Sequence, residues 1–173
     1  MTSVDKLLAT MAEPSEGGKV ILTVDEDLRI ITIPSVALTI GAEGDKNVNQ
    51  LWFQMSRYYR GTDLSGFAPR VNYTNANGAS YYYVCGEPDV TNDTIAFSWL
   101  IADKAAEAKG TVEFSLCLQK YSGDTLLQEF NTTTATLTCL RSIHEWSAEN
   151  DKPEGEASVS VLGNGALDTM ALG

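Results

Sequence analysis

Between residues 19 and 141, apolar and polar residues alternate with a period of two, which is typical of β-strands with one buried face. Ile95, Phe97 and Trp99, for example, are expected on one face of their strand. Turn residues separate the runs, and the expected strands are residues 19–24, 28–33, 36–40, 50–57, 70–74, 80–85, 94–101, 111–121 and 126–139. Short strands with turns between them predict an all-β fold, an antiparallel β-sandwich of immunoglobulin-like or jelly-roll-like type.

Two segments show a helical pattern instead. Val4, Leu7, Leu8 and Met11 lie at helical spacing and predict a short amphipathic N-terminal helix. So short a helix is not stable alone, so we expect it to dock on its own sandwich or on a neighbouring subunit. Residues 103–109 predict a short crossover helix between two strands, capped by an aspartate and ended by a glycine.

The pattern therefore divides the chain into three parts. Residues 1–18 form an N-terminal arm, residues 19–141 form the sandwich, and residues 142–173 form an acidic linker with an apolar tail. An apolar tail after a polar spacer is typical of a segment that reaches a partner, although fraying is an equal alternative. The expected contact residues of the tail are Leu167, Met170 and Leu172.

Charge narrows the class of partner. The chain of 173 residues has a net charge of −11, which argues against nucleic acid and against an anionic membrane surface, since both attract basic proteins. No apolar run is long enough for a membrane-spanning helix, and we expect no secretory leader. Cys85, Cys117 and Cys139 are odd in number and widely spaced, so free, buried thiols are expected.

The residue types that catalysis usually needs are scarce. The chain has one histidine, His144, so neither a histidine-based nucleophile site nor a transition-metal site is expected, and no phosphate-binding glycine motif occurs. We therefore expect no catalytic residue, no cofactor and no metal. Carboxylates in loops leave two lesser alternatives open, a glycosidase pair or a calcium site. These acids are Asp25, Glu26, Asp27, Glu43, Asp45, Asp63, Glu87, Asp89 and Asp93.

Aromatic and basic residues are concentrated between the expected strands 50–57 and 70–74. Protein interfaces are enriched in such side chains because they offer a large contact area at a small loss of entropy. The candidate contact residues are Arg57, Tyr58, Tyr59, Arg60 and Asp63, with Asn75 and Asn77 in a turn expected to adjoin them. An internal Arg–Asp63 bridge that pins the loop is an equal alternative to a partner contact.

Five segments resemble one known family. They are residues 28–34 (LRIITIP), 57–65 (RYYRGTDLS), 70–78 (RVNYTNANG), 93–100 (DTIAFSWL) and 127–137 (LQEFNTTTATL). In this order they resemble the N-terminal domain of the baseplate upper protein family of phages and prophages of Gram-positive bacteria. The resemblance covers roughly residues 19–141. It implies a β-sandwich that attaches to a virion and has no catalytic role.

The expected function is that of a non-enzymatic virion structural protein, made in the bacterial host cytoplasm. Only about thirty residues follow the sandwich and they show no heptads, which favours a capsid decoration protein, a head-fibre protein or a small tail or baseplate component over a long fibre. The expected partners are phage capsid, tail or baseplate proteins, with the chain in a homo-oligomer or symmetric array. The alternative is a glycan-binding module, in which Trp52 and tyrosines stack on sugars of the host surface.

Overall fold

A computed structural model describes residues 18–143 of the chain. The strands are β1 (Val20–Asp25), β2 (Ile30–Thr32), β3 (Thr39–Ala42), β4 (Gln50–Ser56), β5 (Tyr58–Tyr59), β6 (Thr62–Asp63), β7 (Ala68–Thr74), β8 (Ser80–Val84), β9 (Asp89–Val90), β10 (Thr94–Leu100), β11 (Gly110–Ser122), β12 (Thr125–Asn131) and β13 (Ala135–Leu140). Two 3-10 turns, η2 (Ser35–Ala37) and η3 (Leu64–Gly66), join them. The expected all-β fold is confirmed.

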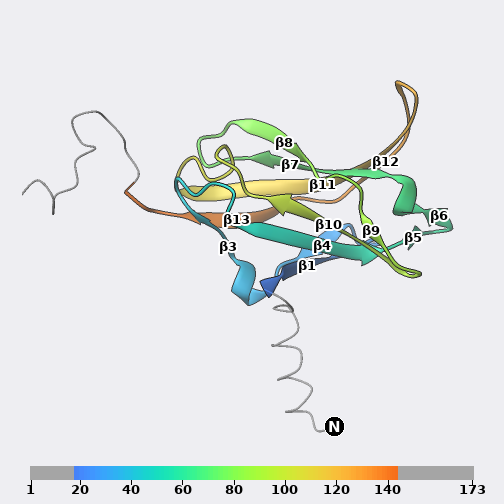
Figure 1. The fold of residues 1–173 in the computed structure, drawn as a ribbon, viewed down its shortest axis with the longest axis horizontal. Helices are drawn as coiled ribbons and strands as arrows, with labels where there is room; N and C mark the ends of the chain where they lie inside the picture. Colours follow the sequence, from blue (N-terminus) through green and yellow to red (C-terminus); the bar gives the residue numbers. More distant parts are fainter. Residues whose placement is uncertain (1–17, 144–173) are drawn as a thin grey trace, which may run out of the picture. The chain divides into compact units, whose positions relative to one another are not determined.

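Except for β5 and β6, which pair only with each other, the strands form two layers (Figure 1). One is a five-stranded sheet in the order β2-β1-β4-β10-β9, and the other is a six-stranded sheet in the order β3-β13-β11-β7-β8, with β12 also paired to β11. Most pairs are antiparallel, as expected, but β1 lies parallel to β4 and β3 lies parallel to β13. Both parallel pairs arise because the chain crosses between the sheets before it returns to a neighbouring strand.

Aromatic side chains join the two layers in the core. Phe53 of β4 packs on Phe114 of β11 with ring centroids 6.0 Å apart. Trp99 of β10 packs on Tyr73 of β7 at 5.2 Å and on Phe114 at 5.5 Å. The predicted inward face of β10 is confirmed, because Ile95, Phe97 and Trp99 are all buried. The interleaved rings hold the sheets together by apolar burial and aromatic contact.

The predicted crossover helix is wrong. Residues 103–109 form turns and bends, and the carbonyl groups that a helix would use internally accept hydrogen bonds from other loops. The carbonyl of Lys104 accepts from the side chain of Asn75 at 2.9 Å, and that of Ala106 accepts from the amide of Gly44 at 2.8 Å. These tertiary bonds outweigh the helix propensity of a segment rich in alanine and lysine.

The run 126–139, expected as one strand, is interrupted. β12 ends opposite Cys117 and β13 begins opposite Phe114, so residues 132–134 face the two residues 115–116. This mismatch is a β-bulge, in which one extra residue is accommodated without loss of the strand direction. The bulge turns the amide of Thr133 away from β11 to donate to the carbonyl of Arg29 at 2.7 Å.

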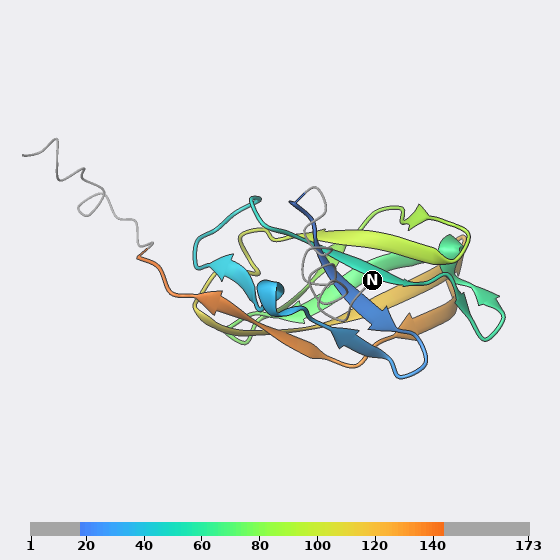
Figure 2. The same cartoon turned by 90° about the horizontal axis from the view of Figure 1, so that it is seen from below.

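The strand directions also fix which loops lie together. β7 begins next to the β5–β6 hairpin and ends at the turn of residues 75–79, so its seven residues separate the two by roughly 20 Å. The hairpin and this turn lie at opposite ends of the sandwich in both views (Figures 1 and 2).

Candidate interaction surface

The candidate residues around Arg57 lie on a short β-hairpin that projects from one end of the sandwich. β5 and β6 pair with Tyr58 opposite Asp63 and Tyr59 opposite Thr62. The two residues at the tip, Arg60 and Gly61, have φ angles of +48° and +87°. Positive φ at both central positions defines a type I′ turn, the turn whose twist matches that of a two-stranded ribbon.

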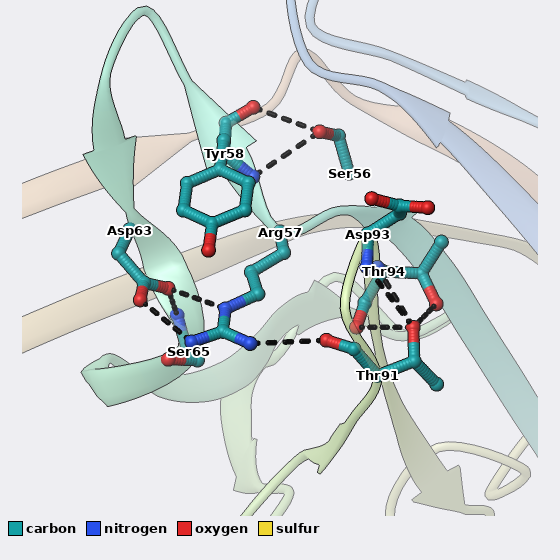
Figure 3. Close-up of polar contacts among 8 residues, drawn as sticks. All are labelled: Ser56, Arg57, Tyr58, Asp63, Ser65, Thr91, Asp93 and Thr94. Carbon is teal, nitrogen blue, oxygen red and sulfur yellow. Dashed lines mark hydrogen bonds and ion pairs between the residues drawn. The ribbon is translucent and has the colours of Figure 1, made fainter.

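The hairpin is closed at its base by an ion pair between Arg57 and Asp63 (Figure 3). Nε of Arg57 donates to Oδ1 of Asp63 at 3.0 Å, and Nη2 donates to Oδ2 at 2.9 Å. Nη1 of Arg57 donates to the carbonyl of Thr91 at 3.1 Å, which ties the hairpin to the loop between β9 and β10. The internal bridge expected as an alternative is therefore present, and the guanidinium of Arg57 is committed within the chain.

The same contacts set the charge states of the pair. The hydrogen bonds from Arg57 lower the pKa of Asp63, and the backbone amide of Ser65 lowers it further. The hydrogen bond to Asp63 in turn raises the pKa of Arg57. Both groups are therefore charged at neutral pH, so protonation does not break the bridge in the physiological range.

A second group of side chains holds the opposite side of the hairpin. The guanidinium of Arg29, in the β1–β2 turn, lies 4.7 Å from the ring centre of Tyr59 and 3.9 Å from that of Phe130. Tyr59 and Phe130 meet edge to face with centroids 5.3 Å apart. The guanidinium of Arg60 lies 5.3 Å from the Tyr59 ring. Tyr59 is therefore part of this packing, and cation–π contacts fasten the hairpin to β12.

Tyr58 points outward and lies next to an apolar groove. Its side chain is 45% exposed and contacts the guanidinium of Arg57 at 5.2 Å. The groove has a volume of about 510 Å³ and runs between the edge strands β8 and β9, where Val84 is 62% exposed and Val90 is 45% exposed. It is lined by Ser65, Gly66, Phe67, Ala68, Val84, Gly86, Glu87, Pro88 and Val90. We call this groove together with Tyr58 the hairpin surface.

The turn that contains Asn75 does not adjoin the hairpin, so that expectation is wrong. It lies at the other end of β7. Asn75 is 3% exposed, and its Oδ1 accepts hydrogen bonds from the amides of Asn77 and Ala79 at 3.0 and 3.1 Å. Asn75 therefore shapes the turn from within. Asn77 is exposed and donates to Glu107 at 3.2 Å.

The other predicted contact residues are Val4, Leu7, Leu8, Met11, Leu167, Met170 and Leu172, and all of them lie outside the described residues, as does His144. Sequence reasoning missed the groove itself. Val84 and Val90 are ordinary strand residues, and their meeting depends on the two sheets ending side by side. Arg29 was also missed, because a single arginine in a turn gives no signal of the rings that pack around it.

Carboxylates and three cysteines are the groups of the described residues that metal or thiol chemistry would use. Within residues 18–143, no group of three or more His, Cys, Asp or Glu side chains is placed to hold a metal ion. Cys85, Cys117 and Cys139 are free, with the last two buried and Cys85 half-buried. Burial raises the pKa of Cys85 to about 12 and also raises the pKa of the other two. These thiols are therefore protonated and unreactive at neutral pH.

In the part of the chain that the structure describes, no helix is long and apolar enough to cross a membrane.

No family model matches the chain, and no curated protein matches it. Among solved structures, the N-terminal domain of phage TP901-1 ORF48 is similar to this chain, with a TM-score of 0.44 and 15% sequence identity. The match covers 70% of this chain and 97% of that one.

Proposed function

We propose that this chain is a non-enzymatic structural protein of a bacteriophage particle, which attaches to other virion proteins through the hairpin surface. The observation that carries the docking role is the ion pair between Arg57 and Asp63. It fixes an exposed hairpin in one shape next to an apolar groove. A contact surface that is rigid before binding loses little conformational entropy when a partner arrives.

The hairpin surface has the composition of a protein interface. Tyr58 is exposed on the hairpin and packs against the guanidinium of Arg57, and Val84 and Val90 are exposed along the groove, so an aromatic ring accompanies an apolar strip. Contacts of this type supply most of the binding energy in protein complexes when a partner covers them. On a particle with repeated subunits, many copies would reinforce one another even if each contact is modest.

The phage assignment is supported by the sequence. Five segments in a fixed order resemble the N-terminal domain of the baseplate upper protein family. Among the described residues, segment 57–65 forms the exposed hairpin, whereas segment 93–100 supplies the core residues of β10. The resemblance thus spans both the scaffold and the proposed contact. Two locations on the particle are proposed. The chain is either a capsid decoration or head-fibre protein, or a small tail or baseplate component.

The test is the composition of the particle. Particles purified from induced cultures of the encoding phage are analysed by mass spectrometry and by cryo-electron microscopy, with and without the gene for this chain. The expected result is a stoichiometric chain in the intact particle and missing density in the deletion particle. If intact particles lack the chain, or if the two reconstructions do not differ, the virion assignment is wrong.

A second arm tests the surface. Val90→Asp places a charge in the groove, and Tyr58→Ala removes the exposed ring, so both are expected to reduce incorporation into particles. Tyr121→Ala is the matched control, because Tyr121 is 50% exposed and does not line the groove. If both variants incorporate like wild type, the hairpin surface is not the contact, while the virion role still stands.

A glycan-binding role is the second candidate. Its support lies on a different part of the molecule, the outer face of the six-stranded sheet.

A further inference from the structure

The outer face of the six-stranded sheet contains a shallow depression of about 360 Å³. Six of the residues that line it are Asn72, Thr74, Ser80, Tyr82, Glu113 and Ser115. The strand register arranges them in two rows, with Tyr82, Asn72 and Ser115 in one, and Ser80, Thr74 and Glu113 in the next. Since neighbouring strands are about 4.8 Å apart, each row is roughly 10 Å long.

Most polar groups in the depression are free to bind a ligand. Within residues 18–143, the side chains of Asn72, Glu113 and Ser115 make no hydrogen bond, whereas Thr74 and Ser80 share one of 2.9 Å. An amide side chain both donates and accepts, a hydroxyl does the same, and a carboxylate accepts. The floor therefore offers donors and acceptors within a few ångströms of each other.

Tyr82 forms an apolar wall beside these polar groups. Its side chain is 62% exposed, and the guanidinium of Arg70 lies 4.8 Å from its ring centre. Arg70 pairs with Val84, on the side of Tyr82 away from Ser80 and Thr74. Arg70 thus supports one face of the ring, and the face toward the depression is left for a ligand.

We propose that this depression binds a neutral oligosaccharide. A sugar ring presents apolar C–H faces and hydroxyl groups that both donate and accept, so its recognition needs a flat aromatic surface next to mixed hydrogen-bonding side chains. Tyr82 supplies the surface, and Asn72, Ser115 and Glu113 supply the hydrogen bonds. The carboxylate of Glu113 and the net charge of −11 disfavour acidic sugars. The volume lies in the range of small-ligand sites.

This site is independent of the proposed virion role. It lies on a sheet face, whereas the hairpin surface lies at one end of the sandwich and in the groove between β8 and β9. Failure of the saccharide proposal would therefore leave the particle assignment untouched, and the reverse holds as well.

The experiment is a titration of the ¹⁵N-labelled full chain with saccharides, monitored by the chemical shifts of the backbone amides. The probes are chitotetraose, maltotetraose and cellotetraose, each raised to about 10 mM so that millimolar binding is detected. With at least one probe, shifts are expected to concentrate at Asn72, Tyr82 and Ser115. Tyr82→Ala is expected to weaken that binding about tenfold or more, because it removes the stacking surface.

Tyr58→Ala is the matched control, since it removes an exposed tyrosine outside the depression and is expected to bind like wild type. Tyr82 is exposed, so its loss should leave the fold intact, which the dispersion of the same spectra verifies. The proposal is overturned if no probe shifts these amides, if shifts concentrate elsewhere, or if Tyr82→Ala binds like wild type. It is also overturned if the amide shifts of β8 change with protein concentration alone. This result would mean that the edge strand pairs with a second copy.

Discussion

Arg57 and Asp63 form a two-point ion pair across the base of the β5–β6 hairpin, with N–O distances of 3.0 and 2.9 Å. The backbone amide of Arg57 also donates to the carbonyl of Asp93 at 2.8 Å, and its carbonyl accepts from the amide of Leu64 at 2.7 Å. Arg57 is therefore joined by both main chain and side chain to the segments on either side of it. The shape of the hairpin therefore depends on this residue.

Arg57→Lys is expected to loosen the hairpin while leaving the sandwich folded. A lysine keeps the positive charge but has no planar fork, so it cannot bind both carboxylate oxygens and the carbonyl of Thr91 together. Hydrogen exchange followed by NMR should show faster exchange at residues 58–63 and unchanged rates in β10 and β11. Arg60→Lys is the control, because Arg60 reaches Asp27 only at 3.8 Å between exposed side chains. Equal exchange in Arg57→Lys and wild type would contradict the bracing role.

Acid is expected to open the hairpin only well below the usual pKa of an aspartate. The folded-state pKa of Asp63 is lowered from the reference value of 3.8, so its ionised form contributes stability above pH 3.8. That contribution is lost as pH falls from 3.8 through the lower folded-state pKa. The Asp63 carboxyl signal and the amide shifts of residues 58–63, followed by NMR between pH 2 and pH 7, should move together below pH 3.8. A transition near pH 4 or above would show that the bridge does not govern this loop.

The buried amide of Asn75 is expected to matter for stability and not for contact. Asn75→Ala leaves the amides of Asn77 and Ala79 and the carbonyl of Lys104 without their partner. Losing partners for buried polar groups costs about 1–3 kcal/mol in the free energy of unfolding, measurable by urea denaturation. Asn77→Ala is the control and should change stability by about 0.5 kcal/mol or less, since Asn77 is exposed. Equal stabilities of the two variants would contradict the structural role.

Much of the scaffold follows from local patterns. The alternation in residues 94–100 predicted the buried face of β10, because one face of a strand must be apolar to cover a core. The error at residues 103–109 has the opposite cause. Their composition favours a helix, but the carbonyls of Lys104 and Ala106 bind other loops, and this information lies far away in the sequence. The parallel pairing of β1 with β4 was missed for the same reason.

The candidate site was predictable only where its partners are close in sequence. Arg57 and Asp63 are six residues apart, so a bridge across a short loop was foreseeable. The distance between the hairpin and Asn75 was not foreseeable. It depends on β7 running the length of the sheet. The saccharide depression likewise depends on the register of Tyr82 against Asn72 and Ser115, which no local pattern specifies.

The three free thiols are expected to stay unreactive until the sandwich unfolds. Burial raises the pKa of Cys85 from a reference value of 9.0 to about 12 and raises those of Cys117 and Cys139 as well, so little thiolate forms at pH 8. The native chain should therefore react slowly with the thiol reagent DTNB at pH 8, and all three thiols should react once urea unfolds it. Because the folded pKa values are raised, the protonated thiols favour the folded state below pH 9, and this contribution is lost as pH rises from 9 toward 12. Cys85→Ala should reduce the alkaline loss of stability, measured by urea denaturation at pH 8 and pH 11. Rapid reaction of Cys85 in the native chain would show that the β7–β8 edge opens far more readily than its packing implies.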